Sequence, residues 1–390
     1  MNYILFDGDY RANLLPLTFT RPVADIRFGI TTIREKWEFY LNSKTSTLTE
    51  VYLSKKYPTI IEMDNILINS SVIPTLELCK AIHDLEVGQL LKTEKLIIAA
   101  RVDDEFSNSE DRFTGLEQIM FNGEFDIVEN SWDIFSMADK YIRQDFYQLT
   151  KNRKSQDLSS TNFVRGDSNQ IFIEEGATVE FAFLNSESGP IYIAKDAEIM
   201  ESSKIRGPFA LGEHSAVKMG AKIYGATSIG PHCKVGGEIN NSVIFAYSNK
   251  GHDGFLGNAV LGEWCNLGAD TNNSNLKNNY EEVRLWSYAD TKFVKTGLQF
   301  CGLIMGDHSK TGINTMLNTG TVIGVSCNIY GSGFQRNFIP SFSWGSPLGM
   351  KAYNLSKAIT VAESVYKRRS LDLDKNEQNI LAHIHKLEQD

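Results

Sequence analysis

The chain lacks several features that would place it in a specialised class of protein. No stretch of its 390 residues approaches the ~20 consecutive apolar residues that a membrane-spanning helix needs. Acidic residues outnumber basic ones, and the net charge of −9 excludes the strongly basic face of a typical nucleic-acid-binding protein. We therefore expect a globular protein with neither a nucleic acid nor a membrane as its partner.

Cysteine is sparse, and its five positions contain no C-x-x-C pair. Scattered thiols of this kind are typical of reduced, buried side chains in a cytosolic protein, rather than of a disulfide framework or a zinc site. The chain starts at Met1 and runs directly into a strand-like pattern at 3–6, without the pattern of a signal peptide. The sequence therefore predicts a cytoplasmic location.

The most informative pattern that is present is an aliphatic residue at every sixth position. A helix repeats every 3.6 residues and a half-buried strand every two, so neither accounts for a period of six. Repeats of six are typical of a β-solenoid, in which short strands form flat faces and the aliphatic side chain points inward. That architecture favours transfer of an acyl group from coenzyme A. The run is too long for chance in a chain that is 42% hydrophobic: Ile193, Ile199, Ile205, Leu211, Val217, Ile223, Ile229 and Val235.

The sequence divides into three predicted domains: an α/β domain (1–155), a β-solenoid (156–340) and a helical cap (341–390). Strand-like and helix-like patterns alternate in the first, which is typical of a layered α/β domain. The repeat is interrupted at 236–254 and at 272–290, and we expect these stretches to be loops that leave the solenoid and carry function. Strands are expected at 3–6, 65–68 and 95–101, helices at 31–41, 75–85 and 132–150, and a linker at 151–160.

The densest polar cluster occupies 248–257 and 263–275. Within it, His252 lies between Gly251 and Gly254, which allow a ligand to approach the backbone closely. An imidazole is suited to take a proton from an attacking amine or hydroxyl near neutral pH. An isolated histidine is more often packed or solvated, but a place in a loop beside the solenoid favours His252 as a general base.

At this cluster the chain resembles a known family. The segments K-G-H at 250–252 and N-L-G-A-D-T-x-x-x-N at 266–275 are similar to the acetyltransferase half of the bifunctional bacterial N-acetylglucosamine-1-phosphate uridyltransferase / glucosamine-1-phosphate N-acetyltransferase. W-D-I-F at 132–135, I-R-G-P-F-A at 205–210 and G-I-N-T-M at 312–316 resemble a divergent branch from Bacteroidetes-type bacteria. The resemblance implies a nucleotidyltransferase-like α/β domain, then a left-handed parallel β-helix with C-terminal helices, assembled as a homotrimer.

The resemblance also implies roles in acetyl transfer. His252 would deprotonate the sugar amine before the amine attacks the thioester of acetyl-CoA. Arg206 lies near the position of an arginine that holds the sugar phosphate, a task that suits a bidentate guanidinium. Phe255 stands where the family has a tyrosine, so one hydroxyl contact is absent. The predicted substrate-binding residues are Arg206, Lys234, Lys250, Asn266 and Asn275.

The amino-terminal motif, L-F-D-G-D-Y-R at 5–11, resembles the phosphate-binding loop of sugar nucleotidyltransferases less closely. Backbone N–H groups after a strand, together with a guanidinium, stabilise charge on a transferring phosphoryl group. Gly8, Arg11 and Arg21 are the nucleotide-binding candidates. Asn69 lies where a metal-binding aspartate is expected, so Mg²⁺ is implied if the domain is active. Only one loop glycine is present, which leaves a degenerate or regulatory domain as an equal alternative.

The resemblance implies acetylation of glucosamine 1-phosphate by acetyl-CoA, followed by uridylyl transfer from UTP to give UDP-N-acetylglucosamine. Two alternatives stay open. The first alternative is a nucleotidyltransferase whose solenoid is only a trimerisation scaffold. The second is a non-catalytic assembly or sensor protein.

Overall fold

The computed structural model describes residues 1–104 and 112–388, which form two compact units. The cysteines are all free thiols, as expected. Among the described residues, no helix has the length and apolar character needed to cross a membrane. The first unit comprises Met1–Leu14, Thr20–Ile26 and Thr31–Asn130, and the second comprises Leu15–Phe19, Arg27–Ile30 and Ser131–Asp390.

The first unit is built on one mixed sheet, which confirms the predicted α/β domain. β1 runs parallel to β4 and to β5, so the carboxyl ends of β1 and β5 meet at Phe6 and Asn69. Helices α1 (Ile33–Leu41) and α2 (Leu76–His83) belong to the same unit. The strand order is β4 (Thr45–Leu48), β1 (Asn2–Phe6), β5 (Asn65–Asn69), β7 (Ile97–Val102), β6 (Gln89–Lys92) and β8 (Glu117–Met120).

Two predicted helices differ from the structure at defined residues. The helix expected from residue 31 begins at Ile33, because Thr32 caps it: the Thr32 hydroxyl accepts from Glu35 N, and the Glu35 carboxylate accepts from Thr32 N. The single helix expected at 132–150 is two helices, α4 (Asp133–Ser136) and α5 (Ala138–Thr150), separated at Met137. Both belong to the second unit.

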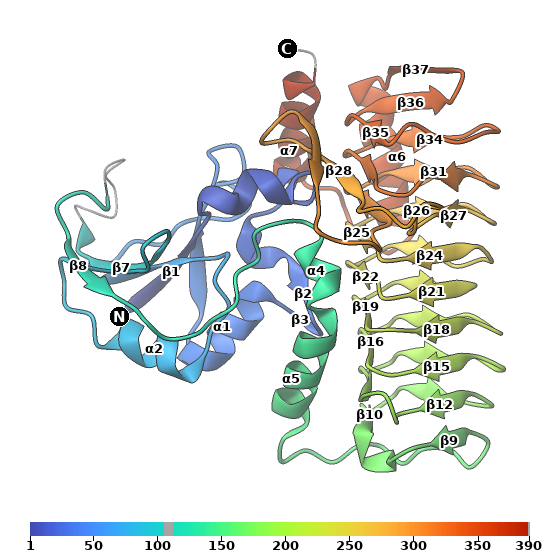
Figure 1. Ribbon diagram of the computed structural model, residues 1–390, viewed down its shortest axis with the longest axis horizontal. Helices are drawn as coiled ribbons and strands as arrows, with labels where there is room; N and C mark the ends of the chain where they lie inside the picture. The colour runs from blue at the N-terminus through green and yellow to red at the C-terminus, as the bar shows by residue number, and fades with distance from the viewer. Residues whose placement is uncertain (105–111, 389–390) are drawn as a thin grey trace. The chain divides into compact units, whose positions relative to one another are not determined.

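The second unit is the predicted β-solenoid, whose short strands stack coil upon coil (Figure 1). Three sheets form its faces. One has nine strands, from β10 (Ile171–Ile173) to β35 (Phe338–Ile339). Another has ten, from β11 (Thr178–Val179) to β37 (Gly349–Ala352). The last has six, from β9 (Phe163–Arg165) to β24 (Phe255–Gly257). The aliphatic residues at every sixth position are all buried in one core cluster, as predicted.

The two predicted loops behave differently. The stretch 236–254 continues to wind, because β21 (Glu238–Asn240), β22 (Val243–Ile244) and β23 (Asn249–Lys250) pair with the preceding coil, so the expectation of a loop there is wrong. The period is lost because the coil shortens: Ala216 pairs with Lys234, 18 residues on (234 − 216), but Lys234 pairs with Asn249, 15 residues on (249 − 234). The stretch 272–290 leaves the solenoid only after β27 (Asn272–Asn273), which still pairs with β32 (Met316–Leu317). It then carries β28 (Arg284–Ser287), which forms a hairpin with β29 (Lys292–Lys295).

The chain ends in two helices, α6 (Leu355–Lys367) and α7 (Lys375–Leu387), as predicted. α6 buries a stripe at four-residue spacing, Ala358, Ala362 and Tyr366. Asp374 caps α7 by accepting a hydrogen bond from Glu377 N at 2.8 Å.

The inward-pointing aliphatic column should carry much of the solenoid's stability. Leu211 is fully buried in the core, and the sheets fix the coils around it, so Leu211→Ala should leave a cavity and lower the free energy of unfolding by about 2–5 kcal/mol. Met219, on the same coil, is 71% exposed, and Met219→Ala should change stability by less than about 0.5 kcal/mol. Denaturant titration followed by circular dichroism compares the two; equal losses would contradict the assignment of the core.

Candidate functional site

A pocket of about 620 Å³ lies on the outer face of the ten-stranded sheet. Its wall follows one outward-pointing column of the ladder, in which Lys234, Asn249, Asn266 and Lys310 pair in turn. These residues come from β20 (Lys234–Val235), β23, β26 (Asn266–Leu267) and β31 (Lys310–Thr311). The end of α6 also lines the pocket, with Val365, Arg368 and Arg369.

His252 lines this pocket from the turn after β23, and its side chain is exposed. The turn packs tightly against the preceding coil. A Cβ on Gly237, whose φ is +70°, would lie 2.7 Å from the His252 carbonyl oxygen. Glycine at 237 therefore allows the His252 backbone to approach the solenoid, with the imidazole still open to the pocket.

Lys250 lies in the inward-pointing column, where it pairs with Val235 in a position that is aliphatic in the preceding coils. Its Nζ donates hydrogen bonds to Gly236 O (3.3 Å), His252 O (2.6 Å) and Asp253 O (3.0 Å), and the side chain is 1% exposed. Burial lowers the pKa of Lys250 to about 8. The ammonium thus holds the backbone of the His252 turn and does not present a phosphate contact to the pocket, contrary to the role expected for it.

The other predicted substrate residues separate into two groups. Lys234 and Asn266 line the pocket with His252. Arg206 does not: it ends β15 (Lys204–Arg206) in the six-stranded sheet and lines a different hollow of about 580 Å³. Asn275 follows β27 (Asn272–Asn273), donates to Asn258 Oδ1 at 2.8 Å, and is absent from the lining of the His252 pocket. The structure therefore brings together three of the six residues predicted for acetyl transfer.

Sequence reasoning missed four cationic residues of this pocket: Lys218, Lys310, Arg368 and Arg369. Lys310 was identifiable in part from the repeat, because it precedes Thr311, which occupies an inward-pointing position. The structure adds that Lys310 pairs with Asn266. The two arginines had none, because only the docking of α6 on the solenoid brings them to the wall.

The charge of Lys310 should make anion binding dependent on pH. Burial lowers the pKa of Lys310 to about 8, and its Nζ donates to His308 O at 2.8 Å. Below pH 8 the pocket has this positive charge, and above it the amine is neutral, so affinity for an anion should fall as pH rises. Between pH 7 and 9 we expect about tenfold weaker binding of adenosine 3′,5′-bisphosphate by calorimetry. Lys310→Met should remove this step; an unchanged step in that variant would contradict the assignment.

In the first unit, two candidate nucleotide-binding residues, Gly8 and Arg11, lie with Asn69 at the carboxyl ends of β1 and β5. A Cβ on Gly8 would lie 2.6 Å from Asn69 Nδ2, so these two residues are in direct contact. Arg11 Nε donates to the Asp7 carboxylate at 2.9 Å, and Arg11 Nη2 donates to the Tyr52 hydroxyl at 3.1 Å. Burial raises the pKa of Asp7, although the Arg11 charge opposes this. Arg11 is therefore held by the protein at the strand end.

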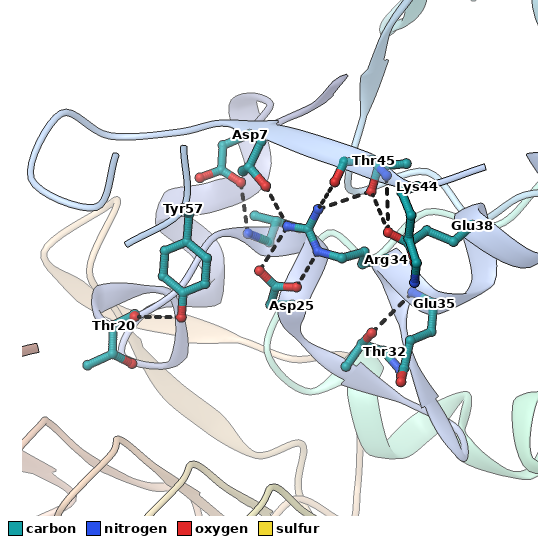
Figure 2. A network of polar contacts seen from close by, with 12 residues as sticks. Asp7, Thr20, Asp25, Thr32, Arg34, Glu35, Glu38, Lys44, Thr45 and Tyr57 are labelled. Atoms are coloured by element: carbon teal, nitrogen blue, oxygen red, sulfur yellow. Dashed lines mark hydrogen bonds and ion pairs between the residues drawn. The ribbon is translucent and has the colours of Figure 1, made fainter. Parts of the chain in front are cut away.

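A second arginine nearby is also held by the protein. Figure 2 shows Arg34 between Asp25 and Thr45. Its Nε and Nη2 donate to the two Asp25 oxygens at 2.6 and 2.9 Å. Arg21 is 4% exposed, with Nη2 3.5 Å from Thr20 Oγ1.

A family model matches the amino-terminal part of the chain, including the first unit and the segment with α4 and α5. Residues 3–154 match the family model described as "Sugar nucleotidyl transferase". The amino-terminal part of the chain is a sugar nucleotidyl transferase domain. The resemblance to bifunctional nucleotidyltransferase/acetyltransferases drawn from the sequence motifs is confirmed.

Curated relatives and a solved structure are similar to parts of the chain. A bifunctional sugar-1-phosphate nucleotidylyltransferase/acetyltransferase of Sulfurisphaera tokodaii is 33% identical over 93 residues, which is 24% of this chain and 23% of the relative. The bifunctional protein GlmU of Synechococcus elongatus is 29% identical over 170 residues, 43% of this chain and 28% of the relative. The matches thus span less than a third of these relatives' own length. The UDP-N-acetylglucosamine acyltransferase of Campylobacter jejuni covers 58% of this chain and 95% of its own at 15% identity, with a TM-score of 0.20.

In the sugar nucleotidyl transferase domain, Asn69 does not fit the predicted role of metal ligand. Its Nδ2 donates to Ile97 O and its Oδ1 accepts from Ser71 N, both at 3.0 Å, and the side chain is 1% exposed. Mg²⁺ prefers accessible oxygen ligands in octahedral geometry, whereas this amide links β5 to β7. Within the described residues, the one cluster of three potential metal-binding side chains lies in the solenoid and is exposed: Asp196, Glu213 and His214.

Proposed function

We propose that the solenoid transfers an acetyl group from acetyl-CoA to the amine of a sugar 1-phosphate, with glucosamine 1-phosphate as the acceptor. The sugar nucleotidyl transferase domain then joins the acetylated sugar phosphate to a uridylyl group from UTP, giving UDP-N-acetylglucosamine. One observation carries the acetyl step: an exposed imidazole, His252, lies in a pocket with the Asn266 amide and several lysine and arginine side chains. Such a pocket suits two substrates that both carry phosphate.

In the proposed reaction, the sugar amine attacks the carbonyl carbon of the thioester while His252 takes a proton from the amine. A C–N bond forms, the C–S bond breaks, and the coenzyme A thiolate leaves with the proton that His252 returns. The backbone N–H of Ala269, at the pocket wall, supports the oxyanion of the tetrahedral intermediate, whereas the Gly268 N–H donates to Thr311 O at 3.1 Å. Lys250 positions His252 through its hydrogen bond to the His252 carbonyl oxygen.

We further propose a homotrimer, in which a second protomer contributes to the donor site. This assembly is supported by the family resemblance of the solenoid. Sedimentation equilibrium of the full chain tests it; a monomer with full acetyltransferase activity would exclude a shared site.

The experiment that tests the function follows both half-reactions with mass-resolved products. Incubation with acetyl-CoA and glucosamine 1-phosphate should release free thiol and give N-acetylglucosamine 1-phosphate; UTP should then give pyrophosphate and the nucleotide sugar. Pyrophosphate without thiol release would favour a nucleotidyltransferase with a scaffold solenoid. The absence of both across a panel of amino-sugar phosphates would favour an assembly or sensor protein.

A further inference from the structure

We propose that Arg368 and Arg369, which follow α6, form with Lys218 and Lys234 a subsite for the phosphate of a substrate beside His252. This inference rests on the proposed function and deepens it. It also gives a binding role to a helix that the sequence predicts only as a cap.

The positive charges at this subsite are concentrated, and no acidic residue of the described chain lines the pocket with them. All four cations line the same pocket, and no aspartate or glutamate of the described chain is among its lining residues, although the whole chain has a net charge of −9. Arg369 Nη2 donates to Asn249 Oδ1 at 3.4 Å, and Lys218 Nζ lies 4.0 Å from Met200 Sδ. Guanidinium and ammonium groups arranged in this way are suited to charge-assisted hydrogen bonds with a phosphate dianion.

The cations also disfavour one another. Burial lowers the pKa of Lys234, and the charges of Arg369, Lys218 and Arg368 lower it further, against a smaller opposing effect of Glu198. Crowded like charges raise the energy of the empty pocket, and a bound anion would relieve this repulsion. This repulsion among the cations is a stronger argument for an anionic ligand than the number of basic residues alone.

An aromatic contact fixes the arginines in place. One corner of the solenoid carries a column of stacked rings, each on a residue with φ between 55° and 60°: His214, His232, Tyr247 and Trp264. Tyr366 of α6 continues this column by stacking on Trp264, with the two ring centroids 3.9 Å apart. The Tyr366 hydroxyl donates to Glu377 Oε1 at 2.9 Å. Because Arg368 and Arg369 lie two and three residues after Tyr366 in the chain, this stack sets where their side chains reach.

A simpler explanation for the arginines is that cations at a helix C-terminus offset the helix dipole, an effect of about 0.3–1 kcal/mol. It does not account for Lys218 and Lys234, which come from two coils of the solenoid and face the same pocket. Lys367 is the last residue of the helix, is exposed and is absent from the pocket lining. It is therefore a matched control, because it shares the dipole but not the subsite.

The test measures binding by calorimetry, independently of turnover. Two probes represent the possible sources of phosphate: adenosine 3′,5′-bisphosphate for coenzyme A, and glucosamine 1-phosphate for the acceptor. In the full chain, Arg368→Ala/Arg369→Ala should weaken at least one probe about ten- to a hundredfold, whereas Lys367→Ala should leave both unchanged. Loss for the first probe alone assigns the subsite to the donor, and loss for the second alone assigns it to the acceptor.

Equal affinities in the wild type and the double variant, or no binding of either probe to the wild type, would overturn the proposal. If the double variant fails to fold, the exposed Lys234→Met provides the same comparison. Tyr366→Ala should weaken the probe as the double variant does, and Tyr366→Phe, which keeps the ring, should restore binding. Probe binding that depends on the arginines without any acetyl transfer would support the subsite and reject the proposed function, so the two failures are distinguishable.

Discussion

Replacing His252 by alanine should reduce acetyl transfer from acetyl-CoA to glucosamine 1-phosphate by about 10²–10⁴-fold, the range typical of loss of a general base. The imidazole is exposed in the pocket and lies on a turn that Lys250 holds from the inside, so alanine should remove the base without altering the fold. Release of free thiol from acetyl-CoA measures the rate. The KM for acetyl-CoA should change little, because the loss concerns proton transfer and not binding.

His83→Ala is the matched control, because His83 is an exposed histidine of α2 in the other unit. Pyrophosphate release from UTP and N-acetylglucosamine 1-phosphate should be unchanged in His252→Ala, since the two reactions are assigned to different units. Thiol release at the wild-type rate in His252→Ala would remove His252 from the mechanism. A parallel loss of both reactions would indicate damage to the fold and not to the site.

The sequence predicts the solenoid well, because burial of one face at a fixed period is a local property of the chain. From Ile193 to Val235 every sixth residue is buried, as expected. The pattern fails where one coil becomes three residues shorter, between Lys234 and Asn249, because a period cannot show whether the chain has left the solenoid or has turned earlier.

The site was less predictable, because a hexapeptide repeat does not specify which outward-pointing residues share one face of the solenoid. Arg206 and Lys234 both occupy strands, yet they lie in different sheets, so only Lys234 faces His252. Arg368 and Arg369 reach the same pocket through the docking of Tyr366 on Trp264, a contact between residues about a hundred positions apart. Asn69 is the opposite case. Its position in the motif suggested a metal ligand, but its side-chain amide donates a hydrogen bond from β5 to Ile97 O of β7.

Lys250 is the residue whose chemistry departs most from its place in the repeat. Val217 and Val235 precede it in the inward-pointing column, and a lysine there buries a charge in an otherwise aliphatic position. Three carbonyl oxygens surround its Nζ, and two of them belong to His252 and Asp253. A valine would fit the core, but the Gly236 and His252 oxygens would lose the Lys250 donor, whereas Asp253 O also accepts from Asp270 N at 3.0 Å. We infer that the lysine is present to fix the turn that carries the base, at a cost in desolvation.

Lys250→Met should therefore keep the volume of the side chain but remove the hydrogen bonds that hold the His252 turn. Two carbonyl oxygens, those of Gly236 and His252, lose a donor at about 1–3 kcal/mol each, so the free energy of unfolding should fall by about 2–6 kcal/mol. Acetyl transfer should drop about a hundredfold, because a shift of about 1 Å in a catalytic group has an effect of that size. Lys195→Met, at an exposed lysine of the same solenoid, is the control and should change neither quantity. Lys250→Arg keeps a donor and should recover part of the rate. Full activity in a stably folded Lys250→Met would show that the turn holds His252 without the ammonium.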